Sequence, residues 1–193
     1  MTNPKKYPYI TFSESITRLH EKKMYRIIRD VGFVTSMVTP YLAYTWAFKA
    51  PSHFKKHCSQ DTLVLLSSFV HGLTFILYFI IALVGGFNAS GVPFGIPLIA
   101  AGQLLNYLVY NRLGQVRAYY GWELDLDNNP PQKGFPFTLG DSQYKGCMLT
   151  VIGFYMCFKP TTELTAVTVT WVFMYFYMIF MENSKCGKVV KND

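Results

Sequence analysis

The stretch KGFPFTLGDSQYKG, residues 133–146, places Asp141 and Tyr144 among glycines, a proline and two phenylalanines. It lies between two hydrophobic halves of the chain, where a plain connecting loop needs none of the aromatic residues. A second candidate group is Glu182, which follows twenty residues that carry no charge except Glu163 at their far end. A carboxylate at the edge of such an apolar run faces either lipid headgroups or a cavity.

A third candidate group is the row of small residues at Ala100, Ala101 and Gly102, followed by Gln103. Small side chains let another group approach the backbone closely, and in membrane proteins that group is commonly a neighbouring helix. The alternative is a flat ligand lying against Ala101, Gly102 and Gln103, with Gln103 and Asn106 as amide partners. The sequence leaves both interpretations open.

The elements that must position these residues are predicted by the hydropathy pattern. The chain is 51% hydrophobic and 17% aromatic, and its charged residues are almost excluded from four blocks, 31–48, 62–84, 93–113 and 162–181. A charge at mid-membrane costs roughly 2.5 to 3.5 kcal/mol on insertion scales, and about 20 apolar residues cross a bilayer as a helix. A fifth apolar run, 147–158, has the length of a re-entrant segment. We therefore predict an all-α integral membrane protein with about four transmembrane or intramembrane helices plus a short re-entrant-length segment.

The positive charge of the chain is concentrated at its start. Seven of the eighteen Lys and Arg precede residue 31, which makes the formal charge of +7 a poor indicator of nucleic-acid binding. Residues 16–31 place apolar side chains on one helical stripe and basic ones largely off it, typical either of a helix lying on an anionic membrane surface or of a solvated helix. The predicted domains are a basic amphipathic segment, 1–30, a membrane-embedded domain, 31–182, and a polar tail, 183–193.

The four cysteines and four histidines show no spacing typical of a metal site or of a disulfide framework. We therefore expect no metal.

The loop charges predict an orientation under the four-span topology. The N-terminus, the loop 85–92 and the tail share one face with ten Lys and Arg, against eight on the other face, which places both termini in the cytosol. The same topology puts Glu182 on the face opposite the loop 133–146. If 147–158 also crosses, the tail moves to the other face.

The residues quoted above resemble a known family. GFPF followed by DSQYKG, with AYYG upstream, GQLL in the third apolar block and a Glu ending the last, is similar to the integral-membrane phospholipid N-methyltransferases. These are the phosphatidylethanolamine and phosphatidyl-N-methylethanolamine N-methyltransferases. The resemblance covers residues 93–185, about half the chain. Ser142 departs from the family pattern, which usually has Pro there, and Met181 stands where many members have a first Glu before the second.

The resemblance implies methyl transfer from S-adenosyl-L-methionine to the amine of phosphatidylethanolamine or its mono- and dimethyl forms, in phosphatidylcholine synthesis at the endoplasmic reticulum. By position, Ala101, Gly102, Gln103 and Glu182 match the cofactor-binding residues of the family. The implied partners are a phospholipid and the bilayer. A non-catalytic lipid-binding protein stays open as an alternative. A prenylcysteine methyltransferase is less favoured, since the Arg-His-Pro-x-Tyr motif of those enzymes is absent.

The implied chemistry needs a neutral amine, because a protonated amine has no electron pair with which to attack. A nearby carboxylate or phenol can accept the proton, and Asp141 and Tyr144 are the predicted catalytic residues. Aromatic faces attract the cationic sulfonium and methylammonium groups by roughly 0.5 to 2 kcal/mol each. Aromatic residues near the predicted interface are Tyr119, Tyr120, Phe135 and Phe137, and basic residues that could hold a lipid phosphate are Arg117, Lys133 and Lys145.

Overall fold

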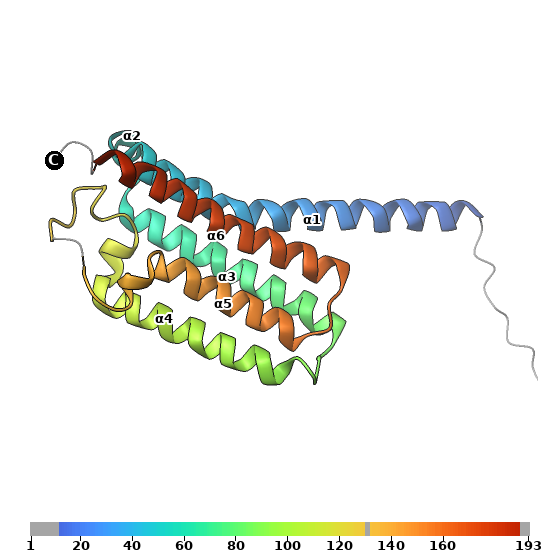
Figure 1. Ribbon diagram of the computed structural model, residues 1–193. Helices are drawn as coiled ribbons and strands as arrows, with labels where there is room; N and C mark the ends of the chain where they lie inside the picture. Colours follow the sequence, from blue (N-terminus) through green and yellow to red (C-terminus); the bar gives the residue numbers. More distant parts are fainter. Residues whose placement is uncertain (1–11, 130–131, 190–193) are drawn as a thin grey trace, which may run out of the picture. The chain divides into compact units, whose positions relative to one another are not determined.

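The computed structural model describes residues 12–129 and 132–189, and the side chains of 31–129 and 132–184. The helices are α1 (Phe12–Lys49), α2 (Pro51–His57), α3 (Gln60–Gly85), α4 (Val92–Ala118), α5 (Ser142–Cys157) and α6 (Thr162–Val189), with a 3-10 turn, η1 (Phe137–Leu139), before α5 (Figure 1). The predicted all-α fold class is confirmed. Contacts divide the chain into two units, Met1–Thr35 and Ser36–Asp193, which are described separately.

The first unit is helical from Phe12 onward, and α1 continues through residue 30 without a break. Residues 1–11 and the side chains of 12–30 lie outside the described residues, so the basic amphipathic face of 1–30 stays a prediction. At the other end of the chain α6 reaches Val189, while residues 190–193 of the predicted tail 183–193 lie outside the described part. The domain limits predicted at 30 and 182 therefore also stay predictions.

Within the described residues, three helices are long and apolar enough to cross a membrane, Gln60–Gly85, Val92–Ala118 and Thr162–Ser184. They match the predicted blocks 62–84, 93–113 and 162–181. Large apolar side chains remain exposed on all three helices, among them Phe69, Leu104 and Phe180. Such surfaces are costly in water and suited to lipid. The predicted block 31–48 is instead the end of the longer helix α1, with Pro40 inside it.

Helices α4 and α5 pack against each other through glycines. A Cβ added to Gly102 would lie 2.5 Å from the carbonyl oxygen of Gly146, and one added to Gly95 would lie 2.5 Å from that of Gly153. Thr150 closes the same contact, since its Oγ1 also lies 2.5 Å from the added Cβ of Gly102. Small residues on both helices thus permit a close backbone approach, as in many membrane helix pairs.

Helix α5 runs the length of this contact and ends beside the loop between α3 and α4. There the N–H of Asn88 donates to the carbonyl oxygen of Cys157 at 2.9 Å, and the N–H of Lys159 donates to that of Gly86 at 2.9 Å. The predicted re-entrant segment 147–158 is therefore most of a helix of 16 residues that is antiparallel to α4 (Figure 1). At 1.5 Å per residue its length is about 24 Å, somewhat less than the ~30 Å of a hydrocarbon core.

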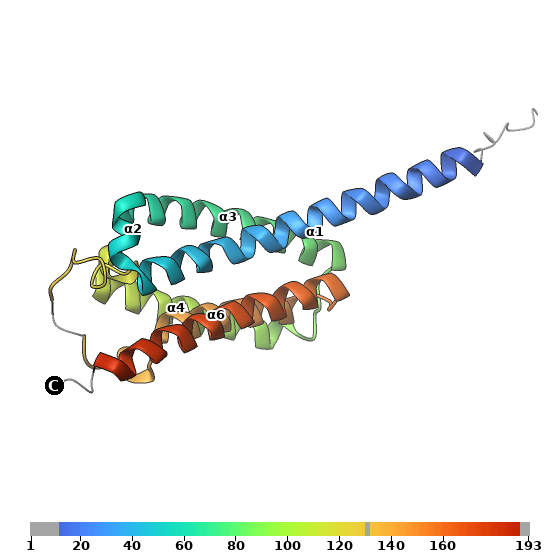
Figure 2. The same cartoon turned by 90° about the horizontal axis from the view of Figure 1, so that it is seen from above.

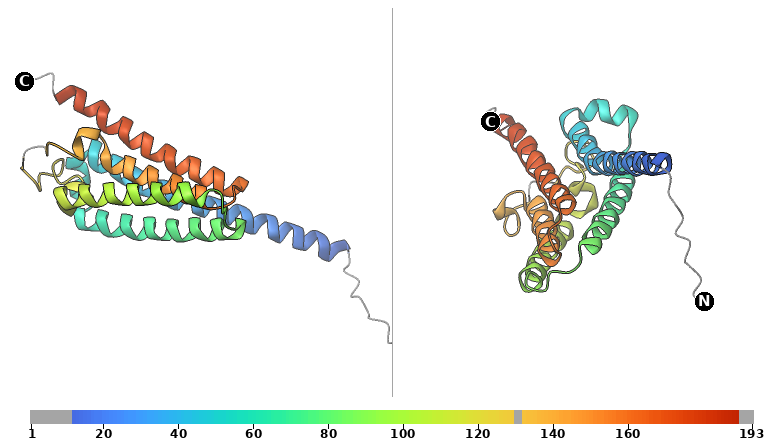
Figure 3. Two further views of the ribbon diagram at one scale, coloured as in Figure 1. Left: turned by 60° about the horizontal axis from the view of Figure 1, so that its bottom comes forward. Right: turned by 90° about the vertical axis from the view of Figure 1, so that its right-hand side faces the viewer.

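The direction of α5 corrects the predicted topology. Because α5 returns the chain to the far end of the bundle, α6 runs back and ends at the same end of the bundle as α4 (Figures 2 and 3). The hydroxyl of Tyr144 at the start of α5 donates to Glu182 near the end of α6, which fixes the two ends together. The prediction that Glu182 and the loop 133–146 lie on opposite faces is wrong.

The part of α1 from residue 36 packs against α3 and α6. The indole N–H of Trp171 in α6 donates to the hydroxyl of Tyr41 at 2.9 Å, and the ring of Tyr41 contacts His71 of α3 with centroids 5.6 Å apart. The hydroxyls of Tyr78 and Thr168 join α3 to α6 at 3.0 Å. These buried polar contacts fix the register of the helices that surround the site.

Candidate active site

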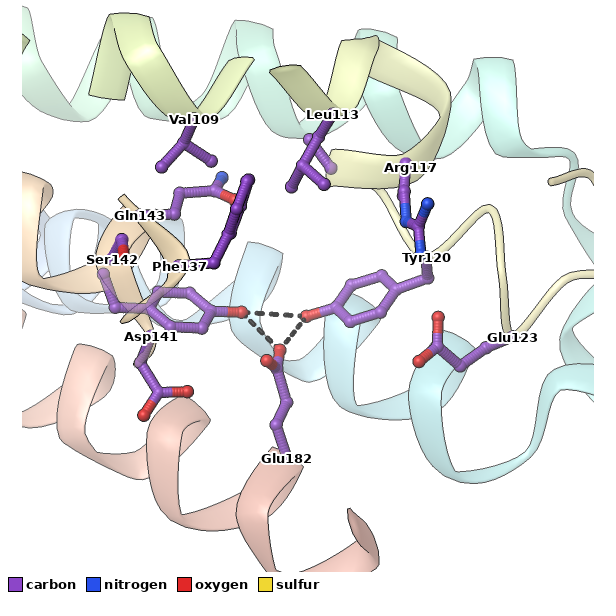
Figure 4. A pocket seen from close by; sticks show the side chains of 12 residues that line it. Val109, Leu113, Arg117, Tyr120, Glu123, Phe137, Asp141, Ser142, Gln143 and Glu182 are labelled. Carbon is purple, nitrogen blue, oxygen red and sulfur yellow. Dashed lines mark hydrogen bonds between the residues drawn. The ribbon is translucent and has the colours of Figure 1, made fainter. Parts of the chain in front are cut away.

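Two phenols and one carboxylate meet at the end of the bundle where α4 ends (Figure 4). The hydroxyl of Tyr144 donates to Oε1 of Glu182 at 2.5 Å, and that of Tyr120 donates to the same oxygen at 2.9 Å. The two hydroxyl oxygens are 3.1 Å apart. Hydrogen bonds to an ionised acceptor are roughly twice as strong as neutral ones, so the two donors stabilise a negative charge on Glu182.

Tyr120 reaches this cluster from a sharp turn directly after α4. Its backbone is left-handed, with φ 62°, and the next residue, Gly121, lies against Val116, where an added Cβ would be 2.7 Å from the carbonyl oxygen. The amide of Gln60, at the start of α3, donates to the carbonyl oxygens of Val116 and Tyr119 at 2.6 and 2.8 Å. The AYYG sequence is thus a fixed turn that aims Tyr120 at Glu182.

The loop before α5 positions Tyr144. The buried hydroxyl of Ser142 donates to the carbonyl oxygen of Pro136 at 2.5 Å, and the ammonium of Lys145 donates to that of Leu139. In the family pattern that the sequence resembles, Pro usually stands at the position of Ser142. Here its hydroxyl holds the turn by a hydrogen bond in place of the rigidity that a proline ring would supply.

The phenol–carboxylate cluster forms part of the wall of a cavity of about 200 Å³. The lining side chains come from α4, the connection between α4 and α5, α5 itself and α6. The lining side chains of α4 are mainly apolar. The charged residues among them are Arg117, Glu123, Asp141 and Glu182, that is, three carboxylates and one guanidinium. The excess of carboxylates favours a cationic ligand group.

The electrostatics of the cluster define its donors and its acceptor. Burial raises the pKa of the Tyr120 phenol well above its usual value, and the charge of Glu182 raises this pKa further. The hydroxyl therefore stays protonated and donates at neutral pH.

Asp141 lies nearby with a half-buried side chain, and its Oδ2 accepts a hydrogen bond from the amide of Asn183 at 3.2 Å. Among the side chains that the structure describes, no group of three or more His, Cys, Asp or Glu is placed to hold a metal ion.

Comparison with known proteins identifies the part of the chain that carries this site. Residues 91–190 match the family described as phospholipid methyltransferase, a range that begins just before α4 and contains α5 and α6. The chain belongs to the phospholipid methyltransferase family. Membership confirms the resemblance drawn from GFPF, DSQYKG and the terminal Glu.

One curated protein is similar to a little under half of the chain. It is phosphatidyl-N-methylethanolamine N-methyltransferase of Arabidopsis thaliana, 32% identical over 90 residues, which are 46% of this chain and 51% of the relative. The chain thus matches about half the length of this relative. No solved structure matches the chain.

The structure brings together three of the residues that the sequence singles out as candidates. Asp141, Tyr144 and Glu182 all line the cavity. Tyr120 and Arg117 line it as well, although the sequence shows them only as an interfacial aromatic residue and a basic residue. The signal for Tyr120 was the AYYG turn directly after a predicted span.

The other three predicted cofactor residues lie in α4 and are not among the residues that line the cavity. Gly102 is buried against α5, the amide of Gln103 donates to Thr150 Oγ1 at 3.0 Å, and Ala101 is exposed. Val109 is the first residue of α4 in the cavity lining, seven residues beyond Gly102, or about 10 Å along the helix. Their contacts match the helix-packing interpretation, and cofactor binding by these residues stays a prediction.

Proposed function

We propose that this chain transfers a methyl group from S-adenosyl-L-methionine to the amine of phosphatidylethanolamine or its mono- and dimethyl forms. The reaction would serve phosphatidylcholine synthesis in the membrane of the endoplasmic reticulum. The observation that carries the proposal is the carboxylate of Glu182, held by two phenols at a cavity within the family-matched helices. The name of the Arabidopsis relative, which specifies methylation of phosphatidyl-N-methylethanolamine, supports this substrate class.

The residues of the cavity suit the cationic groups of both reactants. S-adenosyl-L-methionine, when bound, supplies a methyl group activated by a positively charged sulfur. Glu182 and Asp141 provide negative charge for that sulfonium or for the amine, and the rings of Tyr120 and Tyr144 offer aromatic faces. The volume of about 200 Å³ is below the ~300 to 1,000 Å³ of typical ligand pockets, so the cavity holds reacting ends and not two whole molecules.

Glu182 is the group in the cluster that we assign as proton acceptor. The amine must lose its proton before it attacks, and removal from water lowers the pKa of an ammonium group and so favours the neutral form. Both phenols donate to Oε1, which leaves Oε2 as the atom assigned to take the proton. Tyr144 then positions Glu182, and Asp141 is a second carboxylate within the same cavity.

The test is expression in cells that lack phospholipid methylation, followed by analysis of lipids after labelling with methyl-labelled methionine. We expect labelled mono-, di- or trimethylated headgroups with the wild-type chain. Glu182→Gln, which keeps the shape and removes the charge, should lower the initial rate by about a hundredfold or more, the usual contribution of a positioned base.

Glu163→Gln is the matched control, because Glu163 is an exposed carboxylate in the first turn of the same helix, α6, at its other end. It should methylate at the wild-type rate. Intact, membrane-inserted protein that labels no lipid would refute the proposal, and equal rates for the two glutamine variants would refute the assignment of Glu182.

A further inference from the structure

Helix α4 is broken one turn before its end. Gly114 has φ 71° and ψ 166°, which no residue inside a regular α-helix has, so residues 115–118 form a separate turn. Glycine has the widest choice of backbone angles, and the helix up to residue 113 therefore does not by itself fix the direction of this turn. Because Tyr120 follows directly, its place at the cavity depends on contacts with other elements.

Gln60, at the start of α3, makes a polar contact with this turn. The N–H of Thr62 donates to the hydroxyl oxygen of Ser59 at 3.1 Å, which caps α3 and makes Gln60 its first residue, at the end of the bundle where α4 ends (Figure 1). The amide of Gln60 donates to the carbonyl oxygens of Val116 and Tyr119 at 2.6 and 2.8 Å. The last carbonyls of a helix have no partner within it, so one side chain of α3 satisfies two of them.

The carbonyl oxygen of Val116 is also the acceptor around which the turn closes. The N–H of Gly121 donates to it at 3.0 Å, and the N–H of Tyr119 donates to it at 3.3 Å. Tyr120, whose φ of 62° is left-handed, lies between these two donors. The amide of Gln60 therefore contacts the same oxygen that sets the conformation of the Tyr120 backbone.

Two further contacts reach this part of the chain from other helices. The ion pair of Lys55 with Asp125 joins exposed side chains, and such pairs contribute little in water. The ring of Tyr120 lies with its centroid 5.9 Å from that of Tyr44 and 5.9 Å from that of Phe48. Ring packing of this kind buries the phenol but sets no direction for its backbone. The hydrogen bonds from α3 are therefore the contacts that we expect to hold the turn.

We propose that Gln60 is a positioning residue of the methyltransferase site, which holds the turn after α4 so that the Tyr120 hydroxyl donates to Glu182. This inference rests on the proposed function and adds to its site a residue from outside 91–190, the part of the chain that matches the family. A misplacement of about 1 Å in an active site can cost about a hundredfold in rate. The start of α3 thus takes part in the site although it lines none of the cavity.

Hydrogen exchange of the backbone amides, measured by mass spectrometry on the purified full chain in detergent, tests the contact without turnover. Gln60→Met keeps a similar length and removes both donors. Gln60→Glu keeps the shape, and its ionised carboxylate can only accept hydrogen bonds. Each variant should raise the exchange rates of amides 119–126 about tenfold or more, because two hydrogen bonds are lost. Exchange in α5 and α6 should stay as in the wild type, which shows that the fold is intact.

A double-variant cycle in the methylation assay tests whether Gln60 acts through Tyr120. Gln60→Met alone should lower kcat about tenfold and change KM by less than about twofold, because the geometry of the reacting groups is affected and lipid binding is not. In a chain that already carries Tyr120→Phe, the same change should lower kcat/KM by less than about twofold, since no hydroxyl is left to position. A residue that only supports the fold would lower the rate by the same factor in both backgrounds.

Gln115→Met is the matched control, because Gln115 has an exposed side chain on the same turn. It should exchange and methylate as the wild type does. Unchanged exchange of amides 119–126 in both Gln60 variants, or equal losses of rate in the two backgrounds, would overturn the inference. A wild-type chain that methylates no lipid, with exchange raised as expected in the Gln60 variants, would refute the proposed function and leave the contact of Gln60 with the turn established.

Discussion

Tyr120 and Tyr144 donate to the same carboxylate oxygen of Glu182, and the contribution of each phenol to the rate can be measured by removing its hydroxyl. Tyr120→Phe and Tyr144→Phe each remove one hydroxyl that donates to Glu182 and retain the ring. Since a hydrogen bond to a charged group contributes about 1.5 to 3 kcal/mol, each variant should lower kcat/KM for methylation roughly ten- to a hundredfold.

The double phenylalanine variant tests whether the two phenols act as one unit. Groups that share a partner are coupled, so the double variant should lose less than the product of the single losses. Tyr107→Phe, on an exposed ring of α4, is the control and should keep wild-type kinetics. Independent, multiplicative losses would contradict a shared oxygen.

The chemical types of the residues were a better guide to the lining of the candidate site than their positions in the family pattern. A Glu after an uncharged apolar run and the DSQYKG sequence identified Glu182, Asp141 and Tyr144, which do line one cavity. Tyr120 could not be separated from ordinary interfacial tyrosines, because its contribution depends on the left-handed turn after α4 that aims it at Glu182. An aromatic residue in a sequence carries no such directional information.

At the scale of elements, the contact between α4 and α5 gives opposite stability predictions for two glycines. Gly102→Ala places a methyl group 2.5 Å from the carbonyl oxygen of Gly146, so it should destabilise the protein by about 1 to 3 kcal/mol. Gly72→Ala, in α3, meets nothing within 4 Å and should be neutral or stabilising by up to about 1 kcal/mol. Thermal unfolding in detergent measures both.

The same pair of variants separates the two interpretations of the small residues in α4. Packing predicts lower stability for Gly102→Ala, whereas a contact with S-adenosyl-L-methionine predicts normal stability with weakened cofactor binding. A variant of unchanged unfolding temperature would contradict the close contact with α5.

Helix α5 shows why hydropathy gave the helices of the bundle but not their full topology. A hydropathy profile assumes that every residue of a segment contacts lipid. Residues 142–146 of α5 are polar or small, so only 147–158 was recognised as an apolar run. In the structure α5 packs closely against α4 at Gly146 and Gly153, so this face of α5 contacts protein and not lipid. Pairing between segments is not visible in the hydropathy of either one alone.

For the unit from residue 36 onward, the charges at the two ends of the bundle differ strongly. The Lys and Arg side chains between residues 36 and 184 divide seven to one: Lys49, Lys55, Lys56, Arg112, Arg117, Lys133 and Lys145 at the cavity end, and Lys159 at the other. The ion pair of Lys55 with Asp125 joins α2 to the loop after α4, which places both at the cavity end. Positively charged loops favour the cytosol, so the cavity should face the cytosol.

Cysteine accessibility tests this orientation, because exposed serines lie at both ends of the bundle. Ser52→Cys in α2 marks the cavity end and Ser90→Cys in the loop before α4 marks the other, each in a chain whose own cysteines are replaced by serine. In sealed, cytosolic-side-out vesicles a membrane-impermeant maleimide should modify position 52 at once and position 90 only after detergent is added. The reverse pattern would place the cavity in the lumen, away from the soluble methyl donor, and would contradict both the orientation and the proposed reaction. Modification of both positions in sealed vesicles would contradict the crossing of the bilayer by α3, since α3 is the apolar helix that separates them.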